Sequence, residues 1–337
     1  MTTVAGAATR LAVLGAGTVG SALLRRLSAR SDVEVNGVLV RDANRARDLG
    51  SSSLNLVTDP ARAVEGADVV VELLGGTGLA LELMLESLAA GRKVITGNKA
   101  ALAEHWDEFL PYLRQGQLYF EAAVMAGTPA VAPIASVLRG SEPLRLDAVL
   151  NGTCSFMIGR LADGLSFDEA LAEAQELGYA EADPSLDVGG FDAAHKLAIL
   201  GRLAFDPELS WTTVKAGVRG ITGLTPESVA EAVRAGGSAT LLCSIEPVDG
   251  AWVPRVRPVQ LPAGHELGGL GADRNGFVFN GRHSGKVFVS GPGAGGDSTA
   301  SAVLGDLEQA LAGRAGPAPL ARAATVPSGE PAEVVEL

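Results

Sequence analysis

Residues 10–20, RLAVLGAGTVG, restrict the fold of this chain more than any other stretch. An apolar run leads into three glycines spaced G-x-G-x-x-G, at Gly15, Gly17 and Gly20, and SALLRRLSAR follows with helical spacing. In such a strand–turn–helix unit the first glycine permits a tight turn, the second lets the backbone approach a pyrophosphate, and the third lets helix and strand pack closely. The stretch predicts a dinucleotide-binding unit whose helix start, at Thr18 and Val19, faces the phosphates. A glycine-rich turn without a ligand is the alternative.

The residues that follow extend this unit into a sheet. Helical patterns at 79–91 and 99–113 alternate with apolar runs that are typical of strands, at 33–40, 67–74, 93–98 and 116–124. The run at 67–74 is interpreted as apolar throughout, as a strand covered on both faces should be. Strands that alternate with helices predict an α/β fold, a Rossmann-type doubly wound parallel sheet, over residues 1–130.

The pattern changes after about residue 130. Residues 155–164 and 166–178 look helical, and the second stretch opens with a capping box of Ser166 and Glu169. Further strands that suit a sheet with less helix cover are expected at 142–153, 239–248, 252–261 and 276–291. We therefore predict an α+β domain with a mixed sheet at 131–290, a segment at 291–313 that returns to the first domain and holds a final helix at 299–313, and a flexible tail at 314–337.

Charge and cysteine content exclude several classes of protein. The chain carries 27 Lys and Arg against 39 Asp and Glu, a formal net charge of -12, which argues against nucleic acid or an anionic membrane as partner. Two cysteines, Cys154 and Cys243, cannot form a disulfide framework and fit a reducing cytoplasm. The four histidines are isolated, so a zinc site is not expected. Neither a signal peptide nor an apolar stretch of membrane-spanning length is evident.

The end of the second expected strand bears on the choice of cofactor. NAD-binding folds of this type usually place Asp or Glu there to hold the ribose hydroxyls, whereas an arginine can pair with the 2′-phosphate of NADP. This chain has Arg41 followed by Asp42, with Arg45 and Arg47 close behind. The arginines favour NADP, and Asp42 keeps NAD open because a carboxylate would repel the phosphate. A solvated helix face is the alternative for Arg45 and Arg47.

Residues 177–200, LGYAEADPSLDVGGFDAAHKLAIL, place several charges ahead of an apolar helix. Asp192 and Lys196 are four residues apart and share a helix face, directly after Gly189 and Gly190, where a substrate can approach closely. Taken alone, the pair is also compatible with a simple surface ion pair. His195 is a rival proton donor, but on a helix it points about 100° away from Lys196.

Several stretches match one family in the same order along the chain. They are GAGTVG, NKA (98–100), EAAVMAGTP (121–129), NGTCSF (151–156), the 177–200 stretch and GPGAGGDSTAS (291–301). The chain resembles homoserine dehydrogenase, which interconverts aspartate semialdehyde and homoserine with NAD(P)H in threonine and methionine biosynthesis. The resemblance implies a homodimer, a catalytic and dimerisation role for the second domain, and an active cleft between the domains.

The resemblance also implies roles for individual residues. Lys196 matches the proton donor to the substrate carbonyl oxygen, and Lys99 matches a residue between cofactor and substrate. Hydride transfer to an aldehyde creates an alkoxide, which needs such a cation or donor. The carboxylates suit the ammonium group of a zwitterionic substrate. The residues that match homoserine-binding positions are Glu181, Asp187, Asp192 and Thr153.

Two backbone sites complete what the resemblance implies. Gly178 and Gly295 match positions near the nicotinamide end of the cofactor. The segment 121–128 resembles a loop for a monovalent cation, usually sodium. Its ligands would be a side-chain oxygen of Glu121 and the carbonyl groups of Val124, Ala126 and Thr128. Hard oxygen ligands suit such an ion.

Cys154 leaves further alternatives open. A semialdehyde dehydrogenase forms a thioester and needs a nucleophilic cysteine. The family commonly has Thr here, followed by Asn-Tyr instead of Ser155 and Phe156, so we interpret Cys154 as a small buried residue. The altered turn also fits a paralogue that reduces a related amino-acid aldehyde, and a non-catalytic NADP-binding sensor is a third alternative. No effector-binding module is expected after the final helix, so we expect weak or absent feedback inhibition by threonine.

Overall fold

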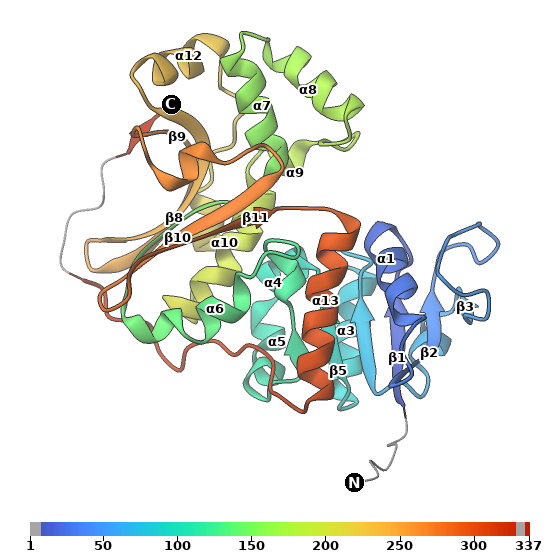
Figure 1. Cartoon of the computed structure of the whole chain (residues 1–337). Coiled ribbons are helices and arrows are strands. Elements are labelled where there is room, and N and C mark those ends of the chain that lie inside the picture. The colour runs from blue at the N-terminus through green and yellow to red at the C-terminus, as the bar shows by residue number, and fades with distance from the viewer. Residues whose placement is uncertain (1–7, 328–333) are drawn as a thin grey trace. The chain divides into compact units, whose positions relative to one another are not determined.

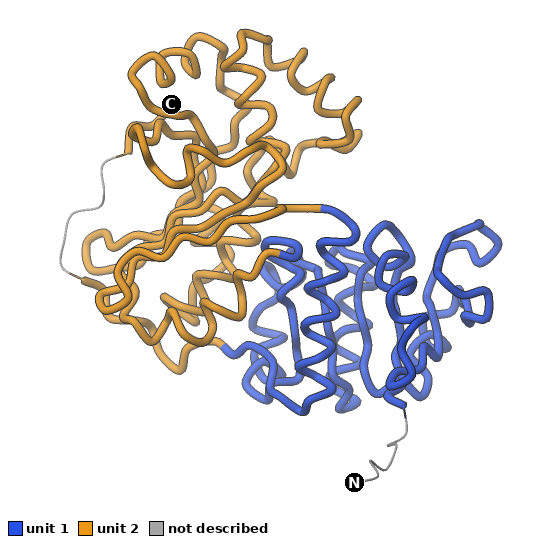
Figure 2. The backbone as a smooth tube through the Cα atoms, in the orientation of Figure 1, with its two compact units in different colours: residues 1–127, 295–318 blue, residues 128–294, 319–337 orange. Residues whose placement is uncertain are grey.

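The computed structural model describes residues 8–327 and 334–337 (Figure 1), which divide into two compact units. Unit 1 extends to Gly127 and includes Gly295–Ala318, while unit 2 consists of Thr128–Ala294 and the residues from Pro319 onward (Figure 2). The sequence places the corresponding limits at 1–130 with 291–313, and at 131–290. The chain therefore leaves unit 1, forms most of unit 2, and returns to unit 1 for one further segment.

Unit 1 is built on a six-stranded sheet with the order β3-β2-β1-β4-β5-β6, in which neighbouring strands are parallel. The strands are β1 (Thr9–Leu14), β2 (Val33–Leu39), β3 (Leu56–Val57), β4 (Val69–Glu72), β5 (Lys93–Thr96) and β6 (Leu118–Tyr119). The helices are α1 (Thr18–Leu27), α2 (Pro60–Val64), α3 (Leu79–Ala89), α4 (Lys99–Glu104), α5 (Trp106–Arg114) and α13 (Gly296–Leu311). The strand order reverses between β1 and β4, the place where such sheets bind ligands. The predicted doubly wound parallel sheet is confirmed.

Helices α1 and α13 lie side by side over one face of this sheet (Figure 1). Leu23 and Leu24 on α1 are buried together with Val303 and Leu307 on α13 and Val13 on β1 in one apolar cluster. Full burial of an aliphatic side chain of this size contributes about 1.5–3 kcal/mol. The segment that returns after unit 2 thus completes the core beneath the glycine turn.

Two elements of unit 1 are shorter than the sequence indicates. The helix expected at 99–113 divides at His105 into α4 and α5. The strand expected at 116–124 is reduced to β6 and is followed by a 3-10 turn, η1 (Glu121–Ala123). The N–H of Glu121 donates to the carboxyl of Asp306 on α13, at 2.9 Å, instead of continuing the sheet. This contact with a distant helix is invisible in the local pattern.

Unit 2 contains a second six-stranded sheet, with the order β11-β10-β7-β8-β9-β12. Its strands are β7 (Pro143–Val149), β8 (Ser238–Val248), β9 (Ala251–Leu261), β10 (Arg274–Gly281), β11 (Gly285–Pro292) and β12 (Val335–Glu336). All pairings between these strands are antiparallel, whereas the sequence predicts a mixed sheet. Tight hairpins join β8 to β9 and β10 to β11, and a hairpin imposes antiparallel pairing.

One helix of unit 2 is enclosed on every side. The helices are α6 (Val131–Ala135), α7 (Gly152–Ala162), α8 (Phe167–Glu176), α9 (Ser185–Val188), α10 (Phe191–Ala204), α11 (Trp211–Ala216) and α12 (Pro226–Arg234). The capping box predicted for α8 is present. Helix α10 is buried from Asp192 to Ala204 and packs on β8, β9, α6 and α11. A helix in this position must satisfy its polar side chains inside the protein.

The described part of the last segment makes specific contacts, although the sequence predicts a flexible tail at 314–337. Tyr119 donates to the carbonyl of Arg314 at 2.6 Å, and the indole N–H of Trp252 donates to that of Ala324 at 3.0 Å. Strand β12 pairs with β9, and Arg219 binds Glu336 at 2.9 Å. The remaining tail residues, 328–333, lie outside the described residues. Across residues 8–327 and 334–337, no helix combines the length and apolar character needed to cross a membrane.

Candidate active site

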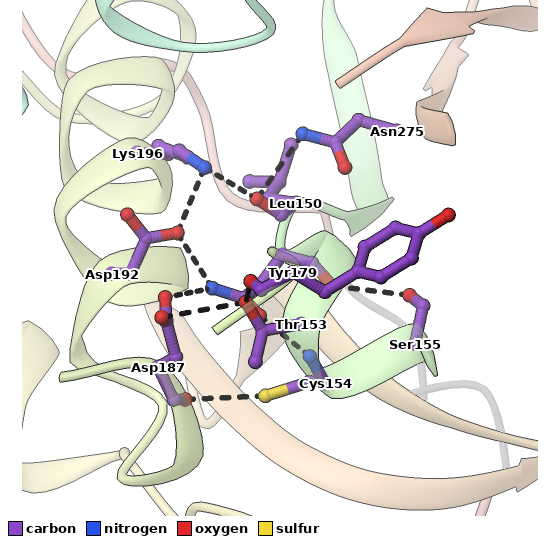
Figure 3. Close-up of polar contacts among 10 residues, drawn as sticks. Leu150, Thr153, Cys154, Ser155, Tyr179, Asp187, Asp192, Lys196 and Asn275 are labelled. Atoms are coloured by element: carbon purple, nitrogen blue, oxygen red, sulfur yellow. Dashed lines mark hydrogen bonds and ion pairs between the residues drawn. The ribbon is translucent and has the colours of Figure 1, made fainter. Parts of the chain in front are cut away.

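Lys196 and Asp192 form a buried pair on the first turns of α10. The Lys196 amine donates to Asp192 Oδ2 at 2.8 Å and to the carbonyl of Leu150, just after β7, at 2.6 Å (Figure 3). Each residue is 9% exposed, so the alternative of a simple surface pair is wrong. Gly190, in the left-handed conformation with φ of 81°, precedes the helix and lets the chain turn sharply into it. The spacing predicted from the sequence therefore brings acid and amine together.

Asn151 connects this pair to the next acid and was missed in the sequence. Its side-chain amide donates to Asp192 Oδ2 at 2.8 Å and to Asp187 Oδ1 at 2.7 Å. Its side-chain oxygen accepts from the N–H of Cys154 at 2.8 Å and caps α7. An asparagine that follows a strand and precedes a helix is a typical cap, which is the one signal that the sequence offered.

The same helix start holds the loop that follows α8. Thr153 donates to the carbonyl of Tyr179 at 2.6 Å and lies 3.4 Å from Asp187 Oδ2. The ring of Tyr179 stacks on Phe156 of α7, with centroids 4.6 Å apart. Glu181, further along this loop, is exposed, and its main-chain carbonyl accepts from Gln175. The structure thus joins Thr153 and Asp187 to the Lys196 network and places Glu181 at the surface of the same unit.

Asn275 on β10 is a second residue that the sequence did not reveal. Its amide donates to the carbonyl of Leu150 at 3.2 Å, so this carbonyl accepts from both Asn275 and Lys196 (Figure 3). Asn275 Oδ1 is buried and has no hydrogen-bond partner among the described residues. Nothing in the pattern of β10 connects it with residues 150–196, because pairing of β10 with β7 creates the contact.

Two rivals for the catalytic role are buried in structural positions. The Cys154 thiol donates to the carbonyl of Asp187 at 3.1 Å, and burial, together with the charges of Asp187 and Asp192, raises its pKa well above the usual range. A thiol in that environment holds little of the thiolate that a thioester mechanism requires. His195 is 4% exposed and stacks on Trp211 with centroids 4.6 Å apart. Cys154 is therefore the small buried residue that the sequence predicts.

In unit 1 the three glycines of the fingerprint have the geometry that their spacing predicts. Gly15 has φ of 106°, and a Cβ there would lie 2.9 Å from the carbonyl oxygen of Leu73. A Cβ on Gly20 would collide with the carbonyl oxygen of Gly15, so only glycine lets α1 approach β1 this closely. At Gly17 a Cβ would meet open space within 4 Å, which leaves the backbone accessible to a ligand. Val19, in the first turn of α1, lies beside these glycines.

A cavity of about 600 Å³ opens beside this turn, a volume typical of ligand sites. Its lining includes the turn itself, the end of β2 and the loop after β4, namely Gly15, Gly17, Thr18, Arg25, Val40, Arg41, Arg45, Arg47, Leu73 and Leu74. Asp42 Oδ1 accepts from the N–H of Asn44 at 2.8 Å, and another acid, Asp48, lines the cavity. Open backbone at Gly17 at the start of a helix is suited to the phosphates of a dinucleotide.

The other residues expected near a cofactor lie in both units. Lys99 is the first residue of α4 in unit 1 and follows Asn98, whose side-chain oxygen caps that helix. Gly295 in unit 1 precedes α13 with φ of 113°, and Gly178 in unit 2 ends α8 with φ of 79°. Both glycines occupy conformations that other residues rarely adopt, which explains their residue type.

The segment 121–128 combines oxygen donors with an unusual backbone. Ala126 has φ of 51°, a conformation that non-glycine residues seldom adopt, and the Thr128 hydroxyl donates to the carbonyl of Pro292 at 3.0 Å. Asp306 holds the N–H of Glu121, and burial raises the pKa of Asp306 to about 8, with the charge of Glu121 adding to the effect. The described residues contain no cluster of three or more His, Cys, Asp or Glu suited to a metal ion.

Family models match most of this chain. Residues 15–120 match the model described as homoserine dehydrogenase, NAD binding domain, and residues 129–307 match the model described as homoserine dehydrogenase. The homoserine dehydrogenase of Corynebacterium glutamicum is 35% identical over 322 residues, which cover 90% of this chain and 72% of that protein. The similarity therefore extends over both units.

Solved structures give the same result. The crystal structure of a homoserine dehydrogenase from Thiobacillus denitrificans has a TM-score of 0.84 and 33% sequence identity, covering 90% of this chain and 74% of that one. A hyperthermophilic archaeal homoserine dehydrogenase mutant in complex with NADPH has a TM-score of 0.72 and 26% identity, covering 90% and 98%. Fold and sequence agree on one family.

Proposed function

This chain belongs to the homoserine dehydrogenase family, and from that premise we propose which role each residue of the site has in the reaction. The enzyme is an NAD(P)-dependent oxidoreductase that acts on a CH–OH group, interconverting homoserine and aspartate semialdehyde. Reduction adds a hydride to the aldehyde carbon and a proton to its oxygen. The bound nicotinamide supplies the hydride, so the protein must supply the proton and hold the substrate.

One observation carries the assignment of the proton donor. The Lys196 amine is buried and held by two acceptors, Asp192 Oδ2 at 2.8 Å and the Leu150 carbonyl at 2.6 Å. A protonated lysine has three N–H donors, so these contacts leave one to donate to the substrate oxygen. We assign Lys196 as the group that protonates the oxygen while negative charge develops on it. In the oxidation direction the neutral amine accepts the hydroxyl proton.

Asp192 keeps this amine aligned. Its carboxylate accepts from both Lys196 and Asn151, and a buried cation left without its counter-charge would be strongly destabilised. Asn151 in turn fixes Asp192 relative to Asp187. We therefore propose that Asp192 orients Lys196 and that Asn151 orients both acids.

A substrate bearing charges of both signs fits the neighbouring groups. Its ammonium group would bind the carboxylates of Asp187 and Glu181. Its carboxylate would bind N–H groups at the start of α7, beside Gly152 and Thr153, where a helix N-terminus favours an anion. Asp192, which also matches a homoserine-binding position, would have two roles: its carboxylate would bind the substrate and would orient Lys196.

We propose NADP as the preferred nicotinamide cofactor, held at Gly15–Gly20 by backbone N–H groups. The arginines that line the cavity support this preference, with Arg41 the first candidate for the 2′-phosphate. The archaeal relative in complex with NADPH also supports it. Lys99 would contact both cofactor and substrate, and Gly178 and Gly295 would let the backbone approach the nicotinamide end.

Three further features belong to the proposal. The segment 121–128 would hold a monovalent cation, such as sodium, through Glu121, Val124, Ala126 and Thr128. The protein would act as a homodimer, as the resemblance implies. Two buried thiols, Cys154 and Cys243, both free, are consistent with a reducing cytoplasm.

Steady-state kinetics test the assignment. The kcat/KM for aspartate semialdehyde should be measured with NADPH and with NADH, for the wild type and for Lys196→Ala. Loss of the proton donor should lower kcat/KM by at least about a hundredfold, or about 2.7 kcal/mol. A loss below about tenfold is too small for the assigned role. A higher kcat/KM with NADH than with NADPH would reject the cofactor preference alone.

A further inference from the structure

Glu72 is a fully buried acid that none of the steps above uses. It is the last residue of β4, with 0% of its surface exposed, in a run that the sequence indicates as an apolar strand. Its Oε1 accepts from the N–H groups of Leu74 and Gly75, at 2.7 and 2.8 Å, and its Oε2 accepts from the Thr96 hydroxyl at 2.6 Å. Burial raises the pKa of this carboxyl. Burying a carboxyl group costs free energy, and the three hydrogen-bond donors around Glu72 offset part of that cost.

The bonds of Glu72 shape the loop after β4. Gly75 and Gly76 both have positive φ, 76° and 81°, which glycine adopts readily, but glycine also loses the most conformational entropy when its backbone is fixed. Leu73 and Leu74 line the cavity beside the glycine fingerprint. The carbonyl of Leu73 also lies where a side chain on Gly15 would collide with it. The carboxylate of Glu72 therefore determines one wall of the dinucleotide cavity.

The same acid reaches the start of α4. Thr96 is paired with Glu72 across β4 and β5, and its hydroxyl oxygen accepts from the N–H of Asn98 at 2.9 Å. Asn98 donates from its side chain to the carbonyl of Gly76 at 2.7 Å and accepts from the N–H of Ala101 at 3.1 Å. Lys99 follows directly. One connected set of hydrogen bonds thus links the loop after β4 with the helix that begins at Lys99.

This set lies at the carboxyl ends of two neighbouring parallel strands, the edge at which such sheets bind their ligands. An aliphatic residue at the end of β4 would fill the space without the cost of burying a carboxylate, but it would leave two backbone N–H groups of the loop unsatisfied. The carboxyl group of Glu72 therefore stabilises the conformation of the loop after β4, whereas an aliphatic side chain would serve the stability of the strand better.

We propose that Glu72 is a positioning residue for hydride transfer, which fixes the cavity wall at Leu73–Gly76 and, through Thr96 and Asn98, the start of the helix that carries Lys99. The inference rests on the proposed role of Lys99 and on cofactor binding in the cavity of unit 1. It predicts the largest effects on the cofactor and on kcat, and a smaller effect on the binding of homoserine, because most of its proposed ligands belong to unit 2 and only Lys99 belongs to unit 1.

The experiment compares Glu72→Ala and Glu72→Gln with Val71→Ala. Val71 is also buried on β4 and belongs to the apolar cluster, so its truncation destabilises the same strand and leaves every hydrogen-bonding group of the Glu72 set in place. NADPH affinity is measured by fluorescence titration without substrate, and kcat and the KM for homoserine are measured with saturating cofactor. We expect Glu72→Ala to raise the Kd for NADPH and to lower kcat, each at least about tenfold more than Val71→Ala, with a smaller rise in the KM for homoserine.

Glu72→Gln keeps an oxygen for Leu74 and Gly75, so it should restore the Kd for NADPH to within about threefold of the wild type. Hydrogen exchange at the Leu74 and Gly75 amides, followed in the cofactor-free protein, should be faster in Glu72→Ala and near normal in Glu72→Gln. If Glu72→Ala does not fold, Thr96→Val keeps the shape and removes only the hydroxyl that links Glu72 to Asn98. This variant should lower kcat at least about threefold.

Two results would overturn the inference. One is a Kd for NADPH in Glu72→Ala equal to that in Val71→Ala, and the other is wild-type kcat in Thr96→Val. The titration does not depend on Lys196 or on turnover. A wild-type enzyme that binds NADPH but fails to oxidise homoserine would therefore count against the proposed function and leave the role of Glu72 in the cavity measurable.

Discussion

The candidate site of unit 1 depends on a local backbone turn, whereas that of unit 2 depends on side chains from distant segments of the chain. In unit 1 the candidate cavity is lined by the glycine turn, whose backbone geometry only glycine allows, by the loop after β4 and by several arginines. In unit 2 the reactive group is a side chain, Lys196, held by Asp192, Asn151 and the Leu150 carbonyl. A backbone site is encoded by spacing within a few residues, and a side-chain network by contacts between distant segments. The difference predicts which substitutions damage cofactor binding and which damage chemistry.

The largest effect is expected when the buried pair is broken. Asp192→Asn removes the counter-charge of Lys196 while keeping the shape, and should lower kcat/KM for homoserine by about a hundredfold. The Kd for NADPH should stay within about twofold, since the glycine turn is untouched. Asp183→Asn is the matched control, because Asp183 is an exposed acid of the same stretch and accepts hydrogen bonds from the neighbouring Ser185. Equal losses of kcat/KM in the two variants would show that the buried Asp192–Lys196 pair has no specific role.

The next largest effect is expected at the glycine turn. Gly20→Ala places a Cβ against the carbonyl oxygen of Gly15, forces α1 away from β1, and should raise the KM for NADPH at least about tenfold. The KM for homoserine should change little. Gly305→Ala provides the control, since a Cβ in that position of α13 meets open space within 4 Å. Cofactor binding that tolerated Gly20→Ala would show that the close approach of α1 to β1 is dispensable.

A smaller, selective effect is expected at the rim. Arg41→Ala should raise the KM for NADPH about fivefold to tenfold while leaving the KM for NADH nearly constant, because only NADP carries the 2′-phosphate. Arg62 on α2 belongs to the same unit but not to the lining of the cavity, so Arg62→Ala should change neither value. If Arg41→Ala raised the KM for NADPH and the KM for NADH by the same factor, Arg41 would have no specific contact with the 2′-phosphate.

The sequence predicts the backbone site better than the side-chain site for a physical reason. The turn at Gly15–Gly20 and the spacing of Asp192 and Lys196 are local features. The structure has the close glycine turn and the contact between the two side chains that the sequence predicts. Asn151 and Asn275 enter the network only because β7, β10 and α10 meet in three dimensions. Glu72 was hidden in a run interpreted as apolar, although a charged residue at the end of a buried strand is itself a signal.

The same distinction explains the errors in the fold. The mixed sheet predicted for unit 2 is antiparallel because of its hairpins, and the predicted helix at 99–113 is interrupted at His105. Strand 116–124 stops early because Glu121 bonds to Asp306, a partner far along the chain. Local propensity gives the type of an element, and long-range hydrogen bonds set where it ends.

The smallest effect is expected at Cys154. Cys154→Ser should keep kcat within about twofold to threefold of the wild type, because the buried thiol has a raised pKa and takes no part in hydride transfer. A raised pKa keeps the thiol protonated as the pH rises through the range where an ordinary cysteine ionises. Iodoacetamide at pH 8 should therefore leave Cys154 and Cys243 unmodified until the protein unfolds, as peptide mass spectrometry can show. Rapid alkylation coupled to loss of activity would restore the thioester alternative.

A crystal structure with homoserine and an oxidised nicotinamide cofactor tests the central claim most directly. We expect the hydroxyl oxygen of homoserine to lie within hydrogen-bond distance of Lys196 Nζ, about 2.6–3.2 Å, with Asp192 still bound to the same amine. A ligand whose hydroxyl group lies beyond about 5 Å from that amine, with another donor in its place, would contradict it.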